Sequence, residues 1–408
     1  MKREIPLRLV WLALCVGTIV CGVASAQAPR RAHAEGAFPR LSQQADQARE
    51  ANDLNRAIQL YHQALAIRPR WAEGWWALGT IYYDRNVYAE AAHALQRLIA
   101  VDPQHGTGHA MLGLCQFELG QDSAALRNIQ VARQLGLSKN DDLRNVVLYH
   151  EGLLFLRKSK FSSAQEALTT LARSGVQEDS AALALGMSVL LVKPENFPPE
   201  GSLGREIILR TGRAEMWAAT KKFEEAKRMY SAVVESAANF PNLHYAYGRF
   251  LLLLHEIDEA VTQFHLEIEN SPRHVQAHLE IAAVRYRIDS AAGVKYAEEA
   301  VRLDPRLPFG HYLLGLLYLD SGQVSKAVPE LQTAAGMVPK EAQFQFALGN
   351  AYAKAGRKED ATRARANFFR LSREHPSSAE PSAYGEQQPL QLDSGASPAS
   401  KGEERQRP

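Results

Sequence analysis

Two pairs of histidines have the spacing of a metal site. His105 and His109 lie in HGTGH, and His274 and His278 lie in HVQAH. Residues four apart on a helix share a face, so each pair could bring two imidazoles to one metal ion. We identify no third ligand near either pair, so we expect no metal and no cofactor.

Patterns for covalent or acid–base catalysis are also weak. Carboxylates occur as sequence neighbours, which point to different sides of a helix and therefore indicate solvated surface: Asp141-Asp142, Glu224-Glu225 and Glu298-Glu299. Cys115 lies between apolar neighbours without a recognisable partner histidine, so we interpret it as a core residue. Phosphate-loop, G-x-S-x-G, H-E-x-x-H and C-x-x-C patterns do not occur. We therefore expect a protein that is not an enzyme.

A 34-residue period organises the chain. Leu78-Gly79 recurs as Leu112-Gly113, and Leu314-Gly315 recurs as Leu348-Gly349. Other members of the period are Ala57, Ala91, Ala125, Ala226, Ala260, Ala327 and Ala361, the turn glycines Gly120, Gly322 and Gly356, and Pro69, Pro103, Pro272, Pro305 and Pro339. Self-similarity at a fixed distance indicates stacked repeats. His109, His244, His278 and His311 share the repeat position of Trp75. A structural role therefore explains the histidines better than a metal does.

These residues resemble the tetratricopeptide repeat family. The motif is clearest in Trp75, Leu78, Gly79, Tyr82, Ala91, Leu95, Leu98 and Pro103. The resemblance implies an all-α, right-handed solenoid of antiparallel helix pairs, called here the first and second helix of each repeat. Gly79 and Ala91 would lie where the two helices cross closely, and larger side chains there would cost about 1–3 kcal/mol.

The repeat pattern predicts a domain organisation with one interruption. Pro194, Pro198 and Pro199 cannot continue a helix, and we expect a degenerate helix and a linker that could act as a hinge there. Low apolar content predicts disorder at both ends of the array. The predicted segments are a signal peptide (1–26), a disordered linker (27–37), repeats 1–4 (38–178), the degenerate helix and Pro-rich linker (179–206), repeats 5–9 (207–374) and a disordered tail (375–408).

The N-terminus has the three parts of a secretory signal peptide. Basic residues in MKREIPLR precede the apolar run Leu9–Val23, and Ala24-Ser25-Ala26 fits a signal peptidase. We expect cleavage after Ala26 and no stable membrane span afterwards, because the run is short for a full span. An uncleaved anchor is the alternative. If the signal is cleaved as expected, the protein would be exported, to the periplasm of a bacterial envelope or as a secreted protein.

The charge balance argues against a nucleic-acid partner. Residues 1–26 contain three of the 47 Lys and Arg residues and one of the 45 Asp and Glu residues, which leaves 44 of each. A nucleic-acid binder would show a basic excess. Without residues 1–26, Cys115 is the only cysteine, so no internal disulfide can form and stability must come from packing.

The resemblance implies a binding site on a concave surface lined by the first helices. Transferred by repeat position, the peptide-binding residues would be Glu73, Trp76, Thr80, Tyr83, Leu114, Phe117, Tyr245, Arg249, Tyr286, Phe309, Tyr312, Phe346 and Asn350. Exposed aromatic side chains are typical of interaction surfaces. In one family variant, Lys and Asn bind a C-terminal carboxylate, but this chain has Ser42 and Asp46 at those positions.

We therefore expect a scaffold that binds a protein or peptide partner non-covalently and serves in assembly of an envelope or secreted complex. The alternative is a self-associating structural protein, a homo-oligomer whose groove is filled by its own tail or a second copy. An anchored or metal-dependent protein is a further alternative.

Overall fold

The computed structural model describes residues 27–137, 141–286 and 288–374, and this part of the chain is all-α, as predicted. It contains helices and no strand within those ranges. The predicted signal peptide and C-terminal tail lie outside the described residues. The chain divides into two compact units, unit 1 at residues 1–140 and unit 2 at residues 141–408.

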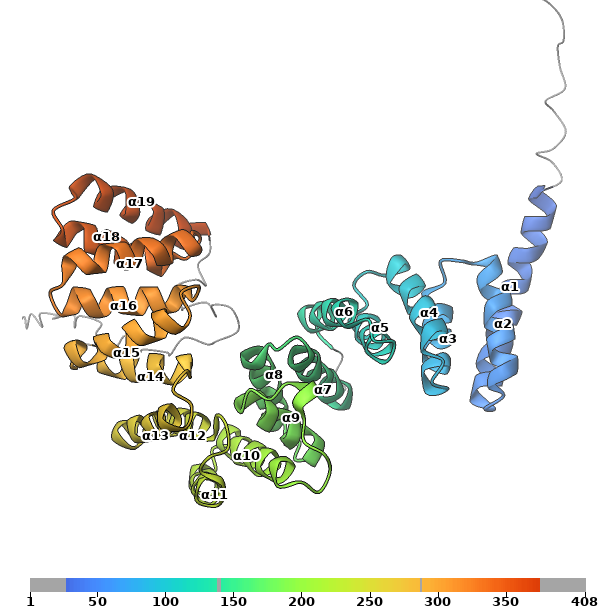
Figure 1. Ribbon diagram of the computed structural model, residues 1–408. Helices are drawn as coiled ribbons and strands as arrows, with labels where there is room; N and C mark the ends of the chain where they lie inside the picture. Colours follow the sequence, from blue (N-terminus) through green and yellow to red (C-terminus); the bar gives the residue numbers. More distant parts are fainter. Residues whose placement is uncertain (1–26, 138–140, 287, 375–408) are drawn as a thin grey trace, which may run out of the picture. The chain divides into compact units, whose positions relative to one another are not determined.

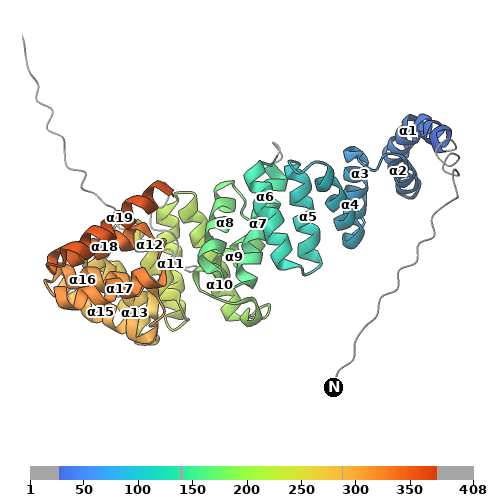
Figure 2. The ribbon, with the colours of Figure 1, turned by 90° about the horizontal axis from the view of Figure 1, so that it is seen from above.

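Consecutive helices pack as pairs in both units (Figures 1 and 2). Unit 1 contains α1 (Gln27–Glu50), α2 (Leu54–Ile67), α3 (Ala72–Asp84), α4 (Tyr88–Val101), α5 (Gly106–Glu118) and α6 (Asp122–Leu135). Unit 2 begins with α7 (Asp141–Arg157), α8 (Phe161–Arg173), α9 (Asp179–Val189), the 3₁₀ turn η1 (Pro194–Asn196), α10 (Leu203–Ala219) and α11 (Phe223–Ala237). It continues with α12 (Leu243–Leu253), α13 (Ile257–Asn270), α14 (Val275–Arg285), α15 (Ser290–Leu303), α16 (Pro308–Asp320), α17 (Val324–Met337), α18 (Ala342–Lys354) and α19 (Lys358–Glu374).

Small residues on the first helix set the distance to the second helix. A Cβ atom placed on the glycine would lie 2.5–2.8 Å from a side chain sixteen residues later, in the pairs Gly79/Leu95, Gly113/Ile129, Gly152/Leu168, Gly248/Phe264 and Gly315/Leu331. Any side chain there would force the helices apart. In two repeats where alanine replaces the glycine, the residue sixteen positions later is tyrosine, in Ala45/Tyr61 and Ala214/Tyr230, and both tyrosines are fully buried.

The turn between the two helices of a repeat uses one residue with a left-handed backbone. Its φ is positive at Asn52, Asn86, Gly120, Ser159, Lys221, His255, Gly322 and Gly356. The predicted turn glycines are thereby confirmed. Glycine adopts this conformation at no steric cost. The other residues in the list adopt it at a cost, because their Cβ atom approaches the backbone.

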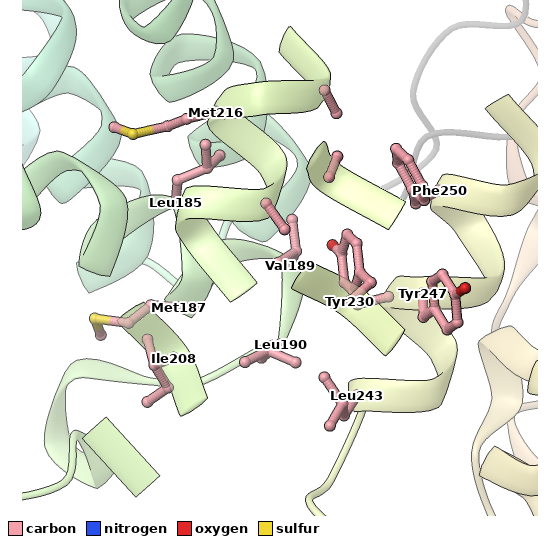
Figure 3. Packing of buried hydrophobic residues seen from close by; sticks show 14 of the residues in the cluster. Leu185, Met187, Val189, Leu190, Ile208, Met216, Tyr230, Leu243, Tyr247 and Phe250 are labelled. Atoms are coloured by element: carbon pink, nitrogen blue, oxygen red, sulfur yellow. The ribbon is translucent and has the colours of Figure 1, made fainter. Parts of the chain in front are cut away.

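Helix α9 corresponds to the predicted degenerate helix, but it is part of the core of unit 2. A Cβ on Gly186 would lie 2.0 Å from the carbonyl oxygen of Ile208, and one on Gly212 would lie 1.8 Å from that of Ala182. The backbones of α9 and α10 therefore touch. Leu185 and Leu190 are fully buried in this cluster (Figure 3). Because α9 buries its apolar side chains, the division between units falls after residue 140 and not at 179–206.

Residues 27–37 are also not a linker, because α1 begins at Gln27. Their polar composition suggested disorder. Helix propagation, however, adds one hydrogen bond per residue onto an existing turn, and α1 is anchored by the buried side chains of Phe38 and Ala45.

Candidate binding surface on the first helices

Helix α3 carries four of the predicted groove residues. Trp76, Thr80 and Tyr83 are half-buried, and Glu73 is exposed. The Trp76 ring lies 5.2 Å from the ring of His105, and the Tyr83 ring lies 5.7 Å from that of Tyr88. These neighbours hold the two aromatic rings in place while leaving part of each accessible.

Two predicted groove residues are not available to a partner. Leu114 on α5 is 2% exposed and Tyr245 on α12 is 7% exposed. Repeat position predicts which helix face a residue occupies, but the neighbouring helix decides whether that face is covered. Phe117 on α5 and Tyr286 after α14 are half-buried, as expected for a surface lining.

The last two pairs of unit 2 carry a group of aromatic side chains. Tyr312 on α16 stacks on Phe344 of α18 with ring centroids 4.6 Å apart, and Phe309 lies 6.1 Å from Tyr312. Phe346 on α18 is 48% exposed. Asn350, one turn later on the same helix, is half-buried. Tyr312 thus joins two adjacent first helices, with Phe346 open to solvent.

The sequence interpretation missed Tyr149 on α7. It precedes Gly152 by three residues, as Trp76 precedes Gly79, and it is half-buried. The signal was present in the repeat spacing, but the surrounding motif is degenerate. An aromatic side chain therefore occupies this repeat position in four first helices with part of its ring accessible: Trp76, Tyr149, Tyr312 and Phe346. We call these four residues the aromatic row.

Arg249, the basic residue of the predicted groove, lies close to a buried carboxylate. Its Nε atom on α12 is 3.8 Å from Oε1 of Glu280 on α14, and its side chain is 32% exposed whereas that of Glu280 is 8% exposed. On the other side, Glu215 of α10 accepts hydrogen bonds from the hydroxyl of Tyr230 and, at 3.3 Å, from the amide of Gln165. Neither glutamate was predicted, because neither belongs to the repeat motif.

Burial governs the charge of both glutamates. It raises the pKa of Glu280 to about 7, against the opposing effects of the Arg249 guanidinium and a hydrogen bond from Tyr245. Burial also raises the pKa of Glu215, although Tyr230, Arg249 and Gln165 oppose it. Oε2 of Glu280 is buried without a hydrogen-bond partner among the described residues. An ionised Glu280 is therefore costly.

The histidines at the Trp75 position fasten successive repeats together. Nε1 of Trp75 donates a hydrogen bond of 2.9 Å to the carbonyl oxygen of Pro69, six residues earlier. Nε2 of three of these four histidines makes the same bond to the equivalent proline, in His109–Pro103, His278–Pro272 and His311–Pro305, whereas His244 has Ala238 at the proline position and contacts Gln263 through Nδ1. Because a carbonyl oxygen only accepts, Nε2 carries the proton. The structural interpretation of these histidines is confirmed by these bonds.

The loop histidines cap helices. Nδ1 of His105 accepts from the backbone N–H of Gly108 at 2.8 Å, and Nδ1 of His274 accepts from that of Ala277 at 3.0 Å. Burial lowers the pKa of His274 to about 4. Cys115 is buried, and burial raises the pKa of its thiol to about 12. Across the ranges that the structure describes, no three His, Cys, Asp or Glu side chains are grouped to hold a metal ion.

Within the same ranges, no helix combines the length and the apolar run that crossing a membrane would require.

Family models agree with the repeat geometry. Models described as tetratricopeptide repeat match residues 77–135 and 312–380, and a second such model matches residues 48–104. The chain therefore contains tetratricopeptide repeats, and the predicted resemblance is confirmed.

Similarity to individual proteins is more distant. Superkiller protein 3 of Schizosaccharomyces pombe is 24% identical over 309 residues, which are 71% of this chain and 20% of that protein, so the chain spans about a fifth of its length. Among solved structures, residues 41 to the end of MamA from Desulfovibrio magneticus RS-1 have 24% identity and a TM-score of 0.40, covering 43% of this chain and all of that one. Yeast Tom70 has 13% identity and a TM-score of 0.34, covering 83% of this chain and 85% of that one.

Proposed function

We propose that the protein is a scaffold that binds a protein or peptide partner non-covalently on the aromatic row and the half-buried side chains beside it. The observation that carries this proposal is the recurrence of a partly exposed ring at one repeat position, in Trp76, Tyr149, Tyr312 and Phe346. Helix pairing needs the small residue three positions later, not an aromatic ring. Rigid rings supply contact area at a low entropic cost, which favours binding.

The proposal extends to location. The signal-like N-terminus supports export to the periplasm or out of the cell, where the scaffold would serve in assembly of an envelope or secreted complex. The intact mass of the protein from its native host tests this. A chain that begins at Gln27 is expected, and a mass that retains residues 1–26 would favour an anchor instead.

The partner surface is tested with a photo-crosslinking amino acid at Trp76 or Tyr312. We expect each position, Trp76 in unit 1 and Tyr312 in unit 2, to cross-link to a protein partner in the cell envelope, and Trp76→Ala with Tyr312→Ala to lower recovery of cross-linked partner at least tenfold. Leu203→Ala is the control, because Leu203 is an exposed apolar residue outside the aromatic row. Equal recovery with the double variant and wild type would exclude this surface. Cross-links solely to a second copy would favour the self-associating alternative.

A further inference from the structure

The last helix of the array retains a packing face for a following helix. In earlier repeats the second helix contacts the next first helix: a Cβ on Gly108 of α5 would lie 2.9 Å from Leu98, and one on Gly310 of α16 would lie 3.4 Å from Val301. The repeat spacing places Phe368 and Phe369 of α19 at the positions of Leu98 and Val301. No helix follows α19 in the described part of the chain (Figure 1).

Aromatic side chains make this end of the molecule apolar. Phe369 is 59% exposed. Its ring lies 5.3 Å from that of Phe368, which lies 5.1 Å from that of Phe346. A terminal repeat of a solenoid usually has a polar outer face, so an exposed phenylalanine at the position that normally receives the next helix indicates an occupant.

The apolar face has a positively charged border. Helix α19 contains five Lys and Arg residues and three Asp and Glu residues. A shallow hollow on it is lined by Ala366, Phe369, Arg370, Arg373 and Glu374. Arg370 pairs with Glu374 at 2.9 Å. An occupant that combines apolar and acidic residues would match this face.

We propose that the chain's own C-terminal segment Pro389–Asp393, which reads PLQLD, docks on this face of α19. The tail begins at residue 375, directly after Glu374. Residues 375–400 contain Glu380, Glu386 and Asp393 and no Lys or Arg, so their charge is opposite to that of α19. Leu390 and Leu392 are the only leucines in the tail and would contact Phe369, while Asp393 would lie near Arg373.

The chain length permits this contact. About 16 residues separate Glu374 from Leu390 and can span up to roughly 50 Å when extended. Packed helix axes lie only about 10 Å apart, so the segment can return to α19 without strain. Docking there would cover Phe369, which is exposed in the described part of the chain.

Hydrogen exchange of the α19 amides in the full-length protein tests the proposal. We expect exchange about tenfold faster in Leu390→Ser with Leu392→Ser than in wild type, because the covering segment is lost. Gln387→Ser with Gln388→Ser is the matched tail control and should leave the rate unchanged. Arg373→Glu should speed exchange of the α19 amides when the tail is wild type. It should have little further effect when Leu390 and Leu392 are already replaced.

The outcomes separate the occupants. Equal α19 exchange in wild type and in the leucine variant would overturn the proposal. Protection that rises with protein concentration, together with a dimer in sedimentation experiments, would assign the face to a second copy and also overturn it. Far-ultraviolet circular dichroism of each variant checks that the array is folded. Binding on the aromatic row is a separate property, so its loss or retention in these variants does not decide this question.

Discussion

The replacement Glu280→Gln should remove a large part of the pH dependence of stability. Burial raises the pKa of Glu280 to about 7 from a reference of 4.5. A carboxyl group whose pKa is raised in the folded state stabilises the fold when protonated. That contribution is complete below pH 4.5 and is lost as the pH rises through 7. The shift of about 2.5 pKa units corresponds to about 3 kcal/mol.

Glutamine has the shape of the protonated glutamate and cannot ionise. We therefore expect the variant and wild type to have similar free energies of unfolding at pH 5. At pH 8, the free energy of unfolding of the variant should exceed that of wild type by up to about 3 kcal/mol. The measured difference will be smaller than this if residual structure in the unfolded state or local relaxation around Glu280 reduces the pKa difference. Arg249 retains Glu215 as a neighbouring carboxylate in the variant.

Urea unfolding at pH 5 and pH 8 measures this difference, with hydrogen exchange of α12–α14 as the local readout. Glu235→Gln, which removes an exposed carboxylate on α11, is the control and should change little at either pH. Histidine titration occurs in both proteins and cancels in the comparison. A variant that is less stable than wild type at pH 8 would show that the ion pair with Arg249 outweighs burial, and would refute the reasoning.

Three further changes test the packing of the repeats. Gly113→Val should destabilise the array by about 1–3 kcal/mol, because a Cβ atom there would lie 2.8 Å from a side chain of the paired helix. Gly336→Val is the control and should cost less, because a Cβ atom at Gly336 meets no atom within 4 Å. The urea midpoints of the two variants measure the difference. Lys221→Gly should raise stability by about 1 kcal/mol, because Lys221 has a φ of 63°; an unchanged or lower melting temperature would contradict this. His311→Gln should flatten the dependence of the free energy of unfolding on pH above pH 6. A hydrogen bond to Glu330 raises the pKa of His311 in the folded state. The stability that His311 contributes is therefore present below pH 6.5 and is lost as the pH rises through the folded pKa. An equal slope in both proteins would argue against that bond.

The sequence by itself determined the repeat and its internal packing. The period of 34 predicted that Gly79 lies where the two helices of a repeat cross closely, and in the structure a Cβ atom on Gly79 would lie 2.8 Å from Leu95 of the paired helix. This was possible because helix pairing within a repeat is local, so a small residue at a constant spacing reports directly on a close helix crossing.

Only the tertiary structure decided which residues are accessible and which charges are buried. Leu114 and Tyr245 occupy surface positions in the repeat and are nevertheless covered, since exposure depends on the neighbouring helix. Glu215 and Arg249 are 34 residues apart and share a repeat position, but Glu280 lies outside that register, and no motif predicted that two buried carboxylates would flank Arg249. Burial and charge coupling are sums over all neighbours in space, whereas a sequence pattern records neighbours along the chain.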